Sequence, residues 1–80
     1  MEDAHIQLAT LMHVVLDYYH DSGRLMTGDM LAIFPSLSIA LRRPDEAHAT
    51  EALARFRRVI VASGIEDTRV KQAMKEEVKI

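Results

Sequence analysis

Residues 30–41, with the sequence MLAIFPSLSIAL, form the most apolar stretch of this chain and contain no charged side chain. An amphipathic surface helix would place a polar residue at every third or fourth position, but this stretch has only Ser36 and Ser38. So apolar a segment needs cover on nearly every side, and a chain of 80 residues has little material to cover it. The stretch therefore predicts a buried, central helix, covered by the rest of the chain and by a second copy or a partner protein.

Pro35 lies in the middle of this apolar stretch. Because proline lacks a backbone N–H and clashes with the preceding turn, we expect the second helix of the chain to be kinked or broken at this residue. Thr27, or Asp29 in its place, is the expected N-cap of that helix. Pro44 cannot continue it, so we expect the helix to end before this residue.

Helical spacing of apolar residues continues over most of the remaining chain, and no alternating strand pattern is present. We expect further helices at residues 3–21 and 45–63, followed by Gly23 and Gly64 as left-handed C-terminal caps. Residues 67–80 carry only a thin apolar stripe among many charges. We expect this last segment to be partly frayed unless another element docks on it.

The composition fits one small helical domain. Hydrophobic residues make up 49% of the chain and aromatic residues only 5%, so the core has to be built from aliphatic side chains. The chain has no cysteine, which excludes a disulfide and leaves association with a partner as the simplest source of additional stability. We predict an all-α fold: a single domain over residues 1–80, built as a small antiparallel bundle of three to four helices.

The charge and hydropathy exclude several classes of partner. The formal net charge is −2, which gives the whole chain no electrostatic attraction to nucleic acid or to an anionic membrane. Its longest run without Asp, Glu, Lys or Arg has 13 residues, well short of the roughly 20 that span a bilayer. The first residues are acidic, unlike those of a secretory signal or transit peptide. We expect a cytoplasmic protein with no membrane partner.

Motifs for catalysis or metal binding are weak. His13, Asp17 and His20 share one helical stripe, but the two histidines are two turns apart, too far for one small ion without a further ligand. A solvated polar face is the simpler interpretation. The serines of the apolar stretch are expected to bond backbone carbonyls one turn back. We therefore expect no enzymatic activity, no cofactor and no bound metal.

Two surfaces are candidates for binding. The first helix has an apolar arc wider than one neighbouring helix needs, and we expect a protein interface there, formed by Leu11, Val14, Val15, Tyr18 and Tyr19. Arg55 and Arg58 share a face of the third predicted helix and are a second candidate, although a solvated face with a Glu51–Arg55 ion pair explains them equally simply.

These surfaces lead to two functional hypotheses. The first is a small adaptor, regulatory or chaperone-like protein that binds another protein or itself, with a homodimer as the simplest case. The alternative is a small dimeric nucleic-acid-binding transcriptional regulator that presents Arg55 and Arg58, although the acidic net charge makes nucleic acid the less favoured partner.

Overall fold

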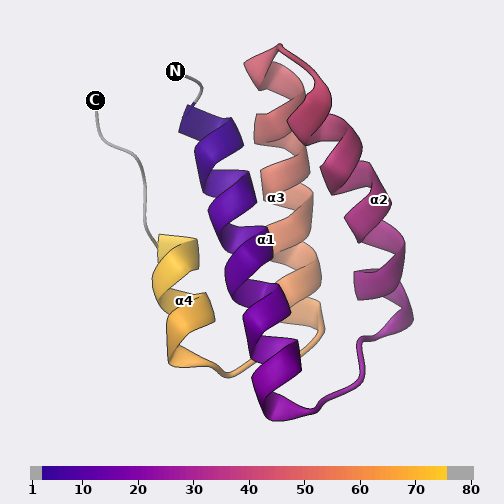
Figure 1. Cartoon of the computed structure of the whole chain (residues 1–80), viewed down its shortest axis with the longest axis vertical. Coiled ribbons are helices and arrows are strands. Elements are labelled where there is room, and N and C mark those ends of the chain that lie inside the picture. The colour runs from indigo at the N-terminus through magenta and orange to yellow at the C-terminus, as the bar shows by residue number, and fades with distance from the viewer. Residues whose placement is uncertain (1–2, 76–80) are drawn as a thin grey trace.

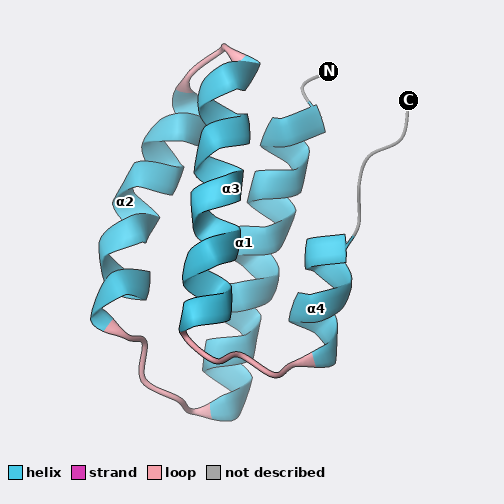
Figure 2. Ribbon diagram, turned by 180° about the vertical axis from the view of Figure 1, so that it is seen from behind, coloured by secondary structure: helices cyan, strands magenta, loops and turns pink. Residues whose placement is uncertain are grey.

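The computed structural model describes residues 3–75, and these residues form four α-helices and no strand. The helices are α1 (Asp3–Ser22), α2 (Gly28–Arg42), α3 (Glu46–Ala62) and α4 (Thr68–Lys75). Successive helices run in opposite directions, and α3 lies between α1 and α2 while the short α4 packs on α1 (Figure 1). Figure 2 shows the opposite side, with α3 in front and α2 beside it. The predicted all-α, antiparallel bundle is confirmed.

One apolar core joins all four helices. Its fully buried side chains are Leu8, Leu11 and Val15 of α1, Met30 and Leu37 of α2, Phe56 and Ile60 of α3, and Val70 of α4. The rings of Phe34 and Phe56 meet edge to face, with 5.6 Å between their centroids. The core is therefore mostly aliphatic, as the composition predicts, with one aromatic pair joining α2 to α3.

Helix α2 is continuous through Pro35, so the predicted break is wrong; the kink stays a prediction. Proline leaves the carbonyl of Leu31 without its usual helical partner. Pro35 and Leu31 both lie on the exposed side of α2, where water can bond that carbonyl. The helix therefore tolerates the proline without ending.

The prediction that α2 is the central, buried helix is also wrong. It lies at the edge of the bundle, packs chiefly on α3, and leaves Leu31 60% exposed and Ile39 52% exposed. The central position belongs to α3, whose Ala49 and Ala52 are fully buried. Because these alanines have almost no side chain, neighbouring helices can approach α3 closely there. The most apolar stretch of the chain is consequently only half covered.

The helix ends follow the local signals of the sequence. Thr27, rather than Asp29, caps α2 by accepting a hydrogen bond from the backbone N–H of Met30 at 3.2 Å. Asp45 caps α3 in the same way. Gly23 and Gly64 have φ values of 72° and 68°, the left-handed conformation expected after a helix.

A small polar cluster closes the end of the bundle where α1 meets the loop to α2. Arg24 donates from Nη1 to the hydroxyl of Tyr18 at 2.7 Å and from Nη2 to the carbonyl of Ser63 at 3.3 Å. The hydroxyls of Thr27 and Ser63 lie 3.2 Å apart and share a further hydrogen bond. These bonds connect the start of α2 to the end of α3.

Tyr19, next to this cluster, has a buried hydroxyl with no hydrogen-bond partner among residues 3–75. We expect Tyr19→Phe to leave stability unchanged or to raise it by about 1 kcal/mol, because the variant removes an unsatisfied buried polar group. The matched control, Tyr18→Phe, should lose about 1–2 kcal/mol with its bond to Arg24. Urea unfolding of both variants measures the difference. Equal losses in the two variants would contradict the unsatisfied state of the Tyr19 hydroxyl.

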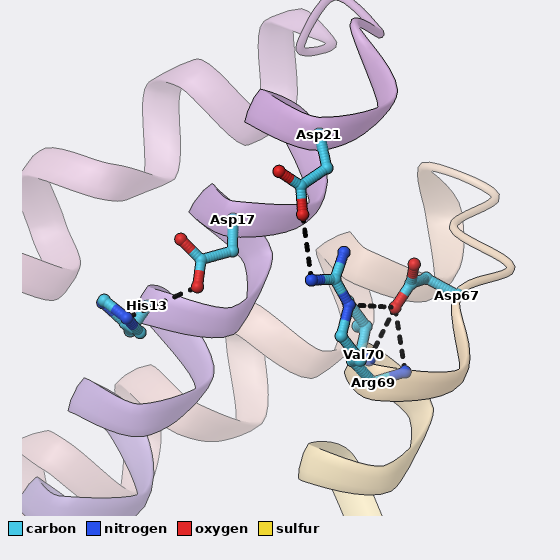
Figure 3. Close-up of polar contacts among 6 residues, drawn as sticks. All are labelled: His13, Asp17, Asp21, Asp67, Arg69 and Val70. Atoms are coloured by element: carbon cyan, nitrogen blue, oxygen red, sulfur yellow. Dashed lines mark hydrogen bonds and ion pairs between the residues drawn. The ribbon is translucent and has the colours of Figure 1, made fainter.

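The segment expected to be frayed is helical as far as it is described. Val70 of α4 is fully buried against the core, and Arg69 donates from Nη1 to Asp21 of α1 at 3.0 Å (Figure 3). The wide apolar arc of α1 thus has α4 as its second neighbour. The remainder of the predicted frayed segment, residues 76–80, lies outside the described residues.

The attachment of α4 is expected to depend on pH through Asp67. Partial burial alone would raise the pKa of Asp67, but hydrogen bonds from the backbone of Val70 and from Arg69 outweigh it and leave the pKa below its ordinary value. A carboxyl with a lower pKa in the folded state stabilises that state above its unfolded pKa of about 4, and this contribution is lost as the pH falls through the folded pKa. Figure 3 shows these bonds around Asp67.

We therefore expect the protection of α4 amides against hydrogen exchange, corrected for intrinsic rates, to be constant from neutral pH to about pH 5 and to fall below about pH 4. In Asp67→Asn, protection should be weaker at neutral pH and depend less on acid. An unchanged acid dependence in Asp67→Asn would show that another group controls the attachment of α4.

Candidate protein-binding surface

The interface residues expected on the first helix do not lie on a free surface of the folded chain. Leu11 is 1% exposed, Val15, Tyr18 and Tyr19 are also buried, and Val14 is half-buried. Their side chains belong to the core that α1 forms with α2, α3 and α4. The arc of α1 is wide because it serves several neighbours within one chain, and a partner cannot reach these residues without opening the bundle.

Arg55 and Arg58 do lie on the surface, beside a groove between α2 and α3. One part of this groove, about 500 Å³ in volume, is lined by Asp29, Ala32, Ile33, Ser36, Arg55, Arg58, Val59 and Ala62. A second part of about 220 Å³ shares Ser36 and Arg55 with the first and is also lined by Ile39, Ala40, Arg43, His48 and Glu51. The two depressions adjoin at Ser36 and Arg55, and together they are called here the α2–α3 groove.

The sequence forms this groove by placing small side chains where the two helices face outward. Ala32 and Ser36 are one turn apart on α2, and Ala62 lies on the facing part of α3. A larger apolar side chain stands within the depression, because Ile39 of α2 lines it and is 52% exposed. An exposed apolar area next to a groove is typical of a site that binds another molecule.

The charged side chains of the groove are mostly without partners inside the chain. Among residues 3–75, no ion pair involves Asp29, Glu51, Arg55 or Arg58, so the expected Glu51–Arg55 pair does not form. The solvated, salt-bridged face considered from the sequence is thus exposed but not internally paired. These groups are available to pair with charges on another molecule.

The end of the groove near the α2–α3 connection is different. There Asp45 accepts hydrogen bonds from the backbone and the ring of His48, and the bond to the ring is the main reason why the pKa of Asp45 is lowered. Arg43 Nε lies 4.0 Å from the same carboxylate. This pairing fixes the first turn of α3 and leaves most of the Arg43 guanidinium at the surface.

The stripe considered for metal binding does not form a metal site. His13 Nε2 lies 3.4 Å from Asp17 Oδ2, and Asp21, one turn further along, is bound to Arg69 (Figure 3). No group of three or more His, Asp or Glu side chains within residues 3–75 is arranged to hold a metal ion. In the same part of the chain, no helix is long and apolar enough to cross a membrane.

Comparison with protein-family models, with curated proteins and with solved structures finds no match for this chain. What the chain binds is therefore inferred from the α2–α3 groove itself. In the sequence, the spacing of Arg55 and Arg58 indicates the α3 side of the groove. The α2 side is not indicated, because the apolar content of that stretch points to the core. The signal on α2 is the row of small or polar residues at helical spacing, Asp29, Ala32, Ser36 and Arg43.

Proposed function

We propose that this chain is a small non-enzymatic adaptor, regulatory or chaperone-like protein that binds a helical partner protein along the α2–α3 groove. One observation carries the proposal: the most apolar helix of the chain lies at the edge of the bundle, and Ile39, which lines the groove, is more than half exposed. Covering a leucine or isoleucine fully is worth about 1.5–3 kcal/mol, which is a large gain for so small a domain to leave unused.

The arrangement of side chains supports a protein partner. Apolar residues with unpaired arginines beside them are typical of the residues that contribute most to protein–protein binding. Both parts of the groove are open to solvent, which fits a helix laid along them better than a small molecule enclosed in a cavity. The small side chains of the groove, Ala32 and Ser36, let a second helix approach α2 closely.

A nucleic-acid partner is less well supported. Asp29 and Glu51 lie in the same groove as Arg55 and Arg58, and their carboxylates would repel a phosphate backbone. Arg57, between the two arginines in sequence, is half-buried and does not extend a basic stripe. Binding of nucleic acid instead of a protein would therefore contradict the proposal.

A photo-activated cross-linker tests the proposed surface directly. We would replace Ile39 by benzoyl-phenylalanine in the full chain, expressed in cells, and identify adducts by mass spectrometry. The control carries the same group at Thr10, an exposed position of α1. We expect a discrete protein adduct from position 39, mapped to one helical segment and reproduced from position 32, but not from position 10. Adducts only with nucleic acid, or none above the control, would overturn the proposal.

A further inference from the structure

The charged side chains of the α2–α3 groove occur in a regular order. Because α2 and α3 run in opposite directions, the end near the start of α2 is also the end near the finish of α3. From that end onward, the groove presents one acid, two bases, one acid and one base, in the order Asp29, Arg58, Arg55, Glu51 and Arg43. Read from the opposite end, the series has the opposite charge at its first, second, fourth and fifth positions and the same charge at its third.

The reversal has the same centre on both helices. On α2, Asp29 and Arg43 are equally far from Ser36, by about 10 Å at 1.5 Å per residue. On α3, Glu51 and Arg58 lie on either side of a midpoint next to Arg55. Ser36 and Arg55 are the two residues that line both parts of the groove. A single axis through this centre therefore relates the opposite charges on both helices.

From this symmetry we infer that the partner is a second copy of this chain, whose α2–α3 groove faces this one about a twofold axis at Ser36 and Arg55. The inference rests on the proposed function and names its partner. The axis crosses the helices, so α2 lies antiparallel on α2 of the second copy and α3 on α3. Asp29 then faces Arg43 of the second copy, and Arg58 faces Glu51 of the second copy. Each pair occurs twice, because a twofold interface repeats every contact.

The apolar side chains agree with this arrangement. Ile39 of one copy meets the part of α2 that carries Ile33 in the other, and Ala32 meets the part that carries Ala40. The contact thus covers Ile39, which the single chain leaves 52% exposed within the groove.

Arg55 is the charged residue of the groove nearest the axis, so it faces Arg55 of the second copy. Like charges directly opposite each other are unfavourable, so its side chain has to turn away from the axis. Glu51 of the second copy is about 4.5 Å away along the helix axis, three residues at 1.5 Å each, within reach of an arginine side chain. Each Glu51 is then flanked by Arg55 and Arg58 of the second copy.

The other twofold arrangement lacks this charge match. With the axis parallel to the helices, α2 of one copy would lie on α3 of the other without reversal. Arg58 would then face the segment of Ala32, and Glu51 would face the segment of Ile39. The carboxylate and the guanidinium would be covered by apolar surface without a partner, which is costly. The antiparallel arrangement is therefore favoured.

The size of the contact predicts a reversible dimer. Helices of 15 and 17 residues are about 22–26 Å long, and two helices side by side are about 20 Å wide. A flat footprint of about 500 Å² is below the roughly 800 Å² per partner of a standard stable complex. We therefore expect a dimer whose dissociation constant lies in the micromolar range, on the order of 1–100 μM.

Charge reversal at Arg58 and at Glu51, first singly and then together, tests the inference in the full chain. Sedimentation velocity over a hundredfold concentration range should show a monomer–dimer equilibrium for the natural sequence. Arg58→Glu and Glu51→Arg should each raise the dissociation constant by about tenfold or more, because two ion pairs become two repulsive contacts. The double variant should return to within about threefold of the original value, because the exchanged side chains again place opposite charges against each other across the axis.

The control is Asp17→Arg, which makes the same change of net charge as Glu51→Arg on the exposed face of α1 and should leave the dimer unchanged. A natural chain that stays monomeric, a dimer that is equally strong in all variants, or a double variant no stronger than the single ones would overturn the twofold pairing. A monomer that still cross-links from position 39 to a different protein would overturn the pairing but not the proposed function. A chain that stays monomeric and gives no protein adduct from position 39 would overturn both the twofold pairing and the proposed function.

Discussion

Leu11→Asp is expected to unfold the chain, whereas Ile39→Asp is expected to leave it folded and to weaken its self-association. Leu11 is 1% exposed and lies in the core, so an aspartate there would place a carboxylate among apolar side chains. An ionised carboxyl without a partner is very unfavourable in such surroundings, and a domain of this size has only about 3–5 kcal/mol of net stability to lose. The far-UV circular dichroism of Leu11→Asp should therefore lose its helical signal.

Ile39→Asp is the comparison, because it introduces the same carboxylate in place of an apolar side chain that lines the groove. Ile39 is 52% exposed, so its aspartate reaches water and the free energy of unfolding should change by about 1 kcal/mol or less. In the proposed dimer, by contrast, the new charge falls in the contact between the two α2 helices. Sedimentation velocity should then show monomer at concentrations where the natural chain is dimeric.

Each variant can contradict the assignment of its helix. A Leu11→Asp chain that is folded but monomeric would place the interface on α1, as the sequence alone suggests, and would show that Leu11 is not a core residue. An Ile39→Asp chain that unfolds would show that α2 is more deeply packed than its exposure indicates. The pair therefore separates core from surface by introducing aspartate at two positions.

The helices and their ends could be predicted from the sequence because they depend on local interactions. The caps at Thr27 and Asp45 and the left-handed glycines at positions 23 and 64 involve residues within one turn of each other. Such signals can be read in a short window of sequence. The all-α class follows from the same local patterns.

The arrangement of the helices could not be predicted in the same way. The apolar content of residues 30–41 points to a central helix, but the central position depends on how closely neighbours can approach, and the buried Ala49 and Ala52 give it to α3. The docking of α4 through Val70 and Arg69 depends on Asp21, 48 positions away from Arg69. The spacing of apolar residues does not show contacts between residues so far apart in the chain. Read alone, the wide apolar arc of α1 therefore points to an external partner.

Only one side of the candidate site could be predicted from the sequence, because the site as a whole depends on tertiary packing. The spacing of Arg55 and Arg58 shows that they share a face, but not what lies beside them. Only the packing of α2 on α3 brings Ser36 next to Arg55 and gives the groove its alternating charges. That the apolar stretch needs cover from outside the chain stays a prediction, and the side of it that is uncovered depends on tertiary structure.

Phe56→Ala is expected to cause the second large loss of stability, about 3–5 kcal/mol, enough to unfold much of the population. Phe56 is fully buried on the central helix, and its ring meets Phe34 of α2 edge to face at 5.6 Å. Its removal leaves a cavity where α2 and α3 join, and the surrounding aliphatic side chains can fill it only partly. Thermal unfolding followed by circular dichroism measures the loss, and a decrease of less than about 1 kcal/mol would contradict this position in the core.

Leucine substitutions keep the chain folded and isolate the contribution of the ring pair. Phe56→Leu and Phe34→Leu retain most of the apolar volume, so each should cost about 1–1.5 kcal/mol in urea unfolding. Because either substitution alone removes the edge-to-face contact, the double variant should lose less than the sum of the two, by about 0.5–1.5 kcal/mol. Additive losses would show that the rings act as independent apolar groups. A measured coupling would show that the aromatic pair itself holds α2 against α3, and so positions the two sides of the α2–α3 groove.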